Sequence, residues 1–376
     1  MRLAPWTVAA AAPFIAAVLA APGAATASAD PAPSVKAPLA KAAYAGLACD
    51  PFDPRLARTS LNNGIGPEAR VAAACWQLEW RGRVKAPTPP ITVHASKTYP
   101  VAMVERVRRG TAAGHRLFGR FADVRSYEAL VSRDAEFSCR KGKELVDPRN
   151  TADPSVIREW SEAYNSGCSG SDYSPSGWTS TILGDGGREY FAWSLTGSDA
   201  NNHFTDSNTL GPMWFLGAMS HEFVHSIQMQ RSLEAKNAPG CCGQESMGRW
   251  FGEGQAQYLG NFVAGLTIGP KDIRSAQLGQ LREVMRQEKV KSVDLAAMEK
   301  DWQTQLVYPA GYFAYEWLVA HYGAEATFTW WNEWNSECER PGSGECWRAK
   351  SQELYGMSAD QILRELNDYV NAQVRG

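Results

Sequence analysis

The sequence predicts an α+β fold, with strands in the first half of the chain and a mainly helical C-terminal half. Before Asn208, short stretches alternate apolar and polar residues, as half-buried strands do. After Asn208, the apolar residues recur at the spacing of helices. Of the 376 residues, 44% are hydrophobic and 11% aromatic, which is enough apolar material for a substantial core.

The chain begins with the features of an export signal. Arg2 precedes an apolar stretch rich in alanine from Thr7 to Ala21, and Ala27-Ser28-Ala29 is a small-residue cleavage site. Prolines interrupt the apolar stretch, so we expect a signal peptide over residues 1–29 and no membrane insertion. The mature chain is then a secreted protein that begins with a Pro/Ala-rich linker over residues 30–45.

The net charge excludes some classes of partner. The chain carries a formal charge of −2, which is close to neutral for its length. A near-neutral balance does not favour binding to nucleic acid or to an anionic membrane. We therefore expect neither partner, and we take the protein to be a monomer.

The cysteines indicate disulfide bonds. The chain has eight, an even number, and an exported protein meets oxidising conditions. Cys338 and Cys346 flank a short loop with a proline and three residues of glycine or serine, so we expect these two to pair. The remaining cysteines are assigned as sequence neighbours, Cys49 with Cys75 and Cys139 with Cys168, while Cys241 and Cys242 stay open as a vicinal pair or with other partners.

The elements follow in chain order. Residues 46–89 form an N-terminal segment of unassigned role, and residues 90–210 form the half that contains the sheet. In that half we expect strands over 91–96, 124–132 and 188–197, a helix over 100–121 and a loop over 167–177. Residues 211–376 form the helical half, with helices expected around 213–230, 248–265, 276–288, 308–323 and 358–373.

One helix of that half carries a metal-binding pattern. In "MSHEFVHSIQMQ", residues 219–230, His221 and His225 stand four apart with Glu222 beside the first. Residues four apart share a helix face, so the two imidazoles can hold one zinc ion while Glu222 reaches a water on it. The pattern predicts a zinc site with Glu222 as general base. The alternative is a core helix with two satisfied histidines.

A third ligand is expected on the next helix, in "WFGEGQAQYLG". Residues 226–252 are enough for one helix to end, a loop to turn and a second helix to return. Glu253 lies there between two glycines beside Trp250 and Phe251, which is a poor place for an ordinary surface carboxylate. Three protein ligands leave a fourth position for water, as a catalytic zinc site requires.

These segments resemble the gluzincin metallopeptidases, the thermolysin-like and aminopeptidase-like group, whose second zinc helix carries a glutamate followed by glycine and small residues. The resemblance implies one catalytic zinc bound by His221, His225 and Glu253, with Glu222 as general base. Residues 308–323 are similar to the helix that follows the zinc helices in the aminopeptidase-like members. That similarity implies that Tyr308 assists the tetrahedral intermediate. Residues 188–197 stand where the family places an edge strand that pairs with extended substrate.

The sequence departs from the family in three places. The loop between the zinc helices is longer than in thermolysin and contains Cys241 and Cys242. One turn after Glu253 stands Gln257 in place of a carboxylate, which implies a different set of groups behind the ligands. No Gly-Met-Glu-Asn run of the kind that binds a free amino terminus is present, so an endopeptidase is favoured over an aminopeptidase.

The sequence therefore predicts a secreted zinc-dependent peptidase that acts on peptides or proteins. No G-x-S-x-G elbow is present, which disfavours a serine hydrolase. The alternative is a catalytically inactive secreted binding protein on the same scaffold. The other histidines of the chain are expected to be structural: His94, His115, His203 and His321.

Overall fold

The computed structural model describes part of the chain. The described residues are 88–121, 124, 126–131, 134, 136–137, 140–141, 144, 181–184, 188–192, 217, 220–225, 227–228, 248–268, 273–299, 304–323, 326–330 and 345–375. The predicted signal peptide, the linker, most of the N-terminal segment, His203 and every cysteine except Cys346 lie outside these residues.

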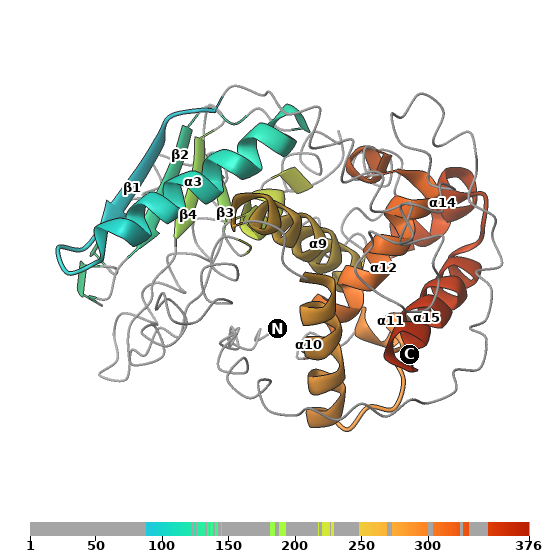
Figure 1. Cartoon of the computed structure of the whole chain (residues 1–376). Helices are drawn as coiled ribbons and strands as arrows, with labels where there is room; N and C mark the ends of the chain where they lie inside the picture. Colours follow the sequence, from blue (N-terminus) through green and yellow to red (C-terminus); the bar gives the residue numbers. More distant parts are fainter. Residues whose placement is uncertain are drawn as a thin grey trace, which may run out of the picture.

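The first half contains a four-stranded mixed sheet with the strand order β1-β2-β4-β3. Its strands are β1 (Ile91–Ala95), β2 (Ser126–Val131), β3 (Thr181–Gly184) and β4 (Arg188–Ala192). β1 and β4 pair with β2 in parallel, and β3 pairs with β4 antiparallel. The parallel strands β1 and β2 are joined through the helix α3 (Val101–Phe118), which lies across the sheet in Figure 1.

The expectation that residues 188–197 form the edge strand is wrong. β4 has a paired strand on each side, β2 and β3, so it lies inside the sheet. Among the described strands, the outer position next to β4 belongs to β3, which pairs with β4 from Thr181↔Phe191 to Gly184↔Arg188. The residues between them are Asp185-Gly186-Gly187, and an Asp-Gly pair is a strong hairpin signal. Any strand addition at this end of the sheet would therefore involve β3.

The helix α3 connects the sheet to the helical half. Val107 and Phe118 are fully buried, and the apolar face they define packs into the core. On the same helix, a side chain at Gly114 would begin 3.3 Å from the ring of Phe223, and the Ser220 hydroxyl donates to the Gly110 carbonyl over 3.4 Å. This packing places the segment with His221 and His225 directly on α3.

The helical half is built around two central helices, α9 (Arg249–Ile268) and α12 (Val307–Tyr322). Nearly every residue of α12 from Val307 to His321 is buried, as expected for a helix that is apolar on all sides. α9 and α12 meet at two glycines: a methyl group at Gly254 would lie 2.5 Å from the carbonyl carbon of Gly311. Backbone contact at this crossing requires glycine, because any side chain would push the helices apart.

Further helices pack around this pair, and Figure 1 shows the one that follows α9 in sequence below it and the others on the side away from the sheet. They are α10 (Ile273–Gln287), α11 (Leu295–Met298), α14 (Glu345–Tyr355) and α15 (Ala359–Arg375). A buried ion pair joins three of the helices: Arg274 of α10 lies 2.9 Å from Glu316 of α12, and Tyr369 of α15 donates to the same carboxylate over 2.6 Å. Within the described part of the chain, no helix is long and apolar enough to cross a membrane.

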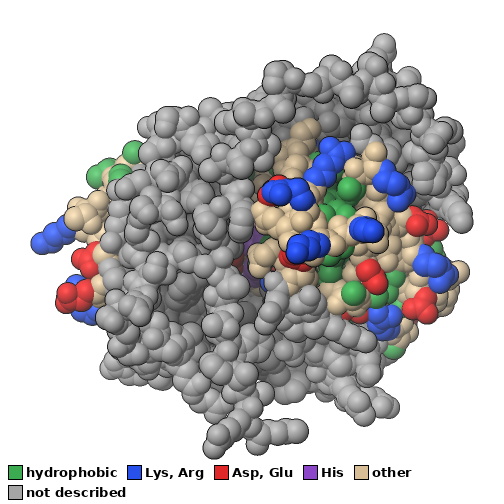
Figure 2. Space-filling view, turned by 90° about the horizontal axis from the view of Figure 1, so that it is seen from below, with side chains coloured by type: hydrophobic (Ala, Val, Ile, Leu, Met, Phe, Trp, Pro, Cys, Tyr) green, Lys and Arg blue, Asp and Glu red, His purple; other side chains and the backbone are tan. Residues whose placement is uncertain are grey.

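Charges of both signs are interspersed on the face shown in Figure 2. Around the C-terminal end of α10, the exposed cations Arg286, Lys289 and Lys291 stand close in sequence to Glu283 and Glu288. Arg286 and Glu283 form an exposed ion pair at 2.5 Å. This face therefore carries no extended surface of one sign among the described residues.

Candidate metal centre

The two histidines lie on one helix, whose described residues are 217, 220–225 and 227–228 and which is called the histidine helix below. His221 is buried, with 7% of its surface exposed, and His225 is partly buried. α9 crosses this helix at Gly260, where a methyl group would lie 2.5 Å from the Gly217 carbonyl oxygen and 2.8 Å from the His221 nitrogen. This close approach of two backbones brings Glu253, two turns earlier on α9, beside the imidazoles.

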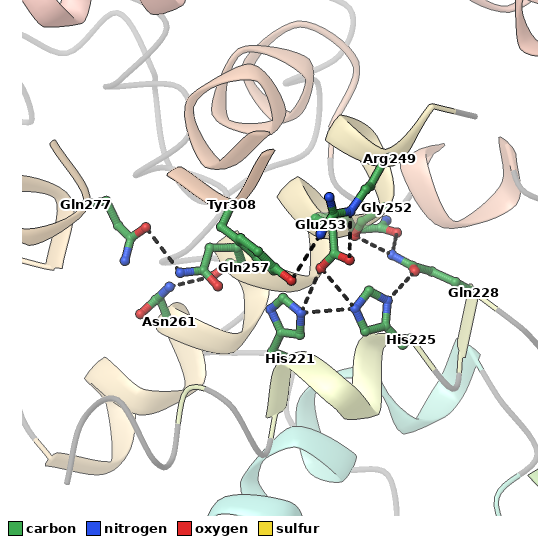
Figure 3. Close-up of polar contacts among 11 residues, drawn as sticks. His221, His225, Gln228, Arg249, Gly252, Glu253, Gln257, Asn261, Gln277 and Tyr308 are labelled. Atoms are coloured by element: carbon green, nitrogen blue, oxygen red, sulfur yellow. Dashed lines mark hydrogen bonds and ion pairs between the residues drawn. The ribbon is translucent and has the colours of Figure 1, made fainter. Parts of the chain in front are cut away.

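Three donor atoms converge between these helices (Figure 3). The Nε2 atoms of His221 and His225 are 3.0 Å apart, and the Glu253 Oε2 atom lies 3.2 Å from the first and 3.4 Å from the second. A tetrahedral zinc ion with bonds of about 2.0 to 2.1 Å separates its ligand atoms by roughly 3.3 Å. The three separations have the size of the edges of such a tetrahedron, so the residues fit a zinc ion in type and in spacing.

The electrostatics of the cluster favour a cation. Burial by itself lowers the pKa of His225, but the hydrogen bond and charge of Glu253, with the charge of Glu222, outweigh it and raise that pKa to about 9. Burial likewise raises the pKa of Glu253, and its contacts with the two imidazoles outweigh this and hold its pKa well below the usual range. A carboxylate that favours protonation of these imidazoles also favours a divalent ion, which would bind in place of the protons.

Glu222 is also buried, at 8% exposure. Its negative charge contributes to raising the pKa of both His225 and Tyr308. These two residues come from different helices, and the charge of Glu222 acts on both. Glu222 therefore lies near the ligand cluster without being one of the three converging donors.

Tyr308 stands in the first turn of α12, with its ring centroid 6.1 Å from that of His221. Its hydroxyl oxygen accepts a hydrogen bond from Arg249 Nη2 over 3.4 Å. The negative charge of Glu253, followed by burial, raises the pKa of Tyr308, so the hydroxyl stays protonated at neutral pH. Because its oxygen accepts from Arg249, its proton can be donated elsewhere.

Arg249 is a site residue that the sequence did not indicate. Besides Tyr308, it contacts Glu253, whose Oε1 lies 3.9 Å from its Nε, and donates from Nη1 to the Thr304 carbonyl over 3.3 Å. The contact with Glu253 spans one helical turn, since the two residues are four apart on α9. Arg249 thus contacts both Tyr308 and Glu253 Oε1, the carboxylate oxygen of Glu253 that does not face the histidines.

Gln257, which the sequence placed among the groups behind the zinc ligands, bonds to a residue of another helix. Its side chain is half-buried and donates to Gln277 Oε1 of α10 over 3.2 Å (Figure 3). The group beside the histidines is Gln228, whose Oε1 lies 2.8 Å from His225 Nδ1. The signal for it was present in the sequence, because residues three apart on a helix are neighbours.

The remaining described histidines have partners of their own. His115 packs against Phe223, with ring centroids 4.1 Å apart, and burial lowers its pKa to about 3. His321 stacks on Trp317 at 3.8 Å, and His94 pairs with Glu128 at 2.6 Å on the sheet. These contacts are those of structural residues.

Comparison of the chain with protein-family models, with curated proteins and with solved structures finds no match.

Proposed function

We propose that this chain is a secreted zinc-dependent peptidase that cleaves peptide bonds. The proposal is carried by one observation: two imidazole Nε2 atoms and one carboxylate oxygen converge at separations of 3.0, 3.2 and 3.4 Å. Two nitrogen donors and one oxygen donor form a set that zinc accepts. Structural zinc sites use four protein ligands, whereas three leave a position for water, so this set favours a catalytic site.

The surrounding residues supply the other roles that hydrolysis needs. A zinc ion held there would polarise a carbonyl and lower the pKa of bound water to about 7. Glu222, buried beside the cluster, accepts a proton from the attacking water and delivers it to the leaving nitrogen. Tyr308 donates its hydroxyl proton as a hydrogen bond to the developing oxyanion, and Arg249 holds that hydroxyl.

The predicted signal peptide supports export, and Cys346 is disulfide-bonded, as an oxidising compartment allows. We further propose that the substrate is a peptide or protein and that cleavage is internal, since no motif for a free amino terminus is present in the sequence.

The test combines metal analysis with a digest. The purified mature chain should contain one zinc per molecule and should cleave a broad peptide library, with both properties lost on chelation and regained on adding zinc. A chain that neither contains nor takes up metal refutes the proposal. A chain that binds zinc, yet cleaves the library no faster than its Glu222→Gln variant, is the inactive binding protein instead.

A further inference from the structure

The carboxamide of Gln228 is buried between the histidine helix and α9, at 2% exposure. Its Nε2 donates to the Gly252 carbonyl over 3.0 Å and to Gln255 Oε1 over 2.8 Å. A backbone carbonyl can only accept, so the amino group of Gln228 must face α9 and its oxygen must face His225. The orientation of this side chain is therefore determined by its partners.

That orientation fixes the state of His225. The Gln228 Oε1 atom lies 2.8 Å from His225 Nδ1, and a carboxamide oxygen only accepts hydrogen bonds. Nδ1 must then carry a proton. When a metal ion replaces the proton on Nε2, the ring is neutral and keeps its one N–H on Nδ1, so Nε2 can present its lone pair to an ion held with His221 Nε2 and Glu253 Oε2.

A second carboxamide anchors the first. Gln255 is fully buried, and its Nε2 donates to the Tyr315 hydroxyl and to Thr327 Oγ1, each over 3.3 Å. With its amino group directed at these partners, its Oε1 faces Gln228. The chain of hydrogen bonds thus runs from the core around α12 through α9 to the histidine helix. Its last link, from Gln228 to His225, is drawn in Figure 3.

We propose that Gln228 is a positioning residue of the metal site, which holds His225 with Nδ1 protonated and Nε2 presented to the ion. The inference rests on the proposed function only in that His221, His225 and Glu253 bind a metal. It does not depend on peptide cleavage. Groups that hold the distal nitrogen of a metal-binding histidine orient the ring and raise its basicity, and their loss costs about 10- to 100-fold in metal affinity.

Three variants of the full mature chain test the inference, with zinc affinity measured by competition with a chromogenic chelator. Gln228→Leu removes the acceptor and should weaken zinc binding by about 10- to 100-fold. Gln228→Glu keeps an acceptor for Nδ1–H but loses the donation to Gly252, so it should keep zinc affinity while lowering the melting temperature. Gln277→Leu removes another buried carboxamide, at 7% exposure, and should leave zinc affinity unchanged.

The contrast between the two Gln228 variants separates positioning from simple packing. Zinc affinity that falls equally in both, in proportion to their melting temperatures, would overturn the proposal, as would wild-type affinity in Gln228→Leu. Nitrogen-15 spectra of the zinc-loaded wild type should show His225 bound through Nε2 with a protonated Nδ1, and the reverse assignment also refutes it. A wild-type chain that takes up no zinc refutes the proposed function and this inference together, whereas zinc binding without cleavage refutes only the catalytic role.

Discussion

Gly260 of α9 lies against the backbone of His221, so closely that a methyl group on Gly260 would stand 2.8 Å from the His221 nitrogen. The histidine helix and α9 therefore meet through main-chain atoms at this point. The contact lies on the helix that carries Glu253, and it sets the separation between that carboxylate and the imidazoles. The geometry of the candidate metal site depends on it.

Gly260→Ala should lower the free energy of unfolding by about 1 to 3 kcal/mol, because the added methyl group forces two backbones apart. It should also weaken zinc binding, since Glu253 would move away from the histidines. Gly279→Ala on α10 is the matched control, because a methyl group there would have no atom within 4 Å. That control should be neutral or slightly stabilising. Denaturant unfolding and chelator competition measure both effects, and equal behaviour of the two variants would contradict the predicted contact.

Glu222→Gln should reduce peptide cleavage by about 10² to 10⁴ while zinc stays bound, because the amide keeps the shape of the side chain and removes the base. Glu253→Gln should lower metal occupancy as well. Steady-state kinetics and metal analysis of both variants distinguish the roles. If Glu222→Gln turns over substrate at nearly the wild-type rate, Glu222 is not the base.

Tyr308→Phe removes the hydroxyl that Arg249 contacts and should lower kcat by about 10² with little change in KM or in zinc content. Arg249→Met should lower kcat in the same direction, because the tyrosine loses the group that holds it. Tyr322→Phe, on the same helix but hydrogen-bonded to the Tyr355 carbonyl, is the control and should retain wild-type kcat. A Tyr308→Phe variant with unchanged kcat would remove this tyrosine from the mechanism.

His115 makes the stability of the fold depend on pH. Its folded-state pKa of about 3 lies below the ordinary value of 6.5, because burial disfavours the charged form. The neutral ring thus contributes stability that is fully present above pH 6.5 and is lost as the pH falls toward 3, since only the unfolded chain takes up the proton. Between pH 7 and pH 5, the wild type should lose about 2 kcal/mol more than His115→Phe. Equal losses in urea unfolding at the two pH values would show that His115 does not titrate in this way.

Cys346 is disulfide-bonded in α14, and Cys338 is its predicted partner. A non-reduced digest should contain a peptide that joins the two, because they flank a short turn-rich loop. Cys338→Ser should then lower the melting temperature and leave a Cys346 thiol that alkylating reagents modify once the chain is unfolded, because this side chain is only 1% exposed in the fold. A linked peptide that pairs Cys346 with another cysteine would refute the pairing.

The sequence alone was sufficient to predict most of the strands and helices and the residues that share a helix face. Strands over β1, β2 and β4 and the helices α3, α9 and α12 follow from alternation and helical spacing, which depend on neighbouring residues only. The spacing of His221 and His225 likewise determines that they share a helix face, and Glu253 was indicated by its place between glycines on the next helix. Their roles as zinc ligands stay a prediction.

Only the tertiary structure decided which elements touch. Among the described strands, β4 is an inner strand and β3 lies outside it, since strand order depends on pairing between distant segments. The carboxamide beside His225 belongs to Gln228. Gln257 of α9 donates instead to Gln277 of α10. Arg249 reaches Tyr308 across 59 residues of sequence, and Gly260 meets Gly217 where two helices cross. Helical periodicity predicts the face on which a residue lies, but the partner opposite that face is selected by packing of the whole core, for which local sequence carries no signal.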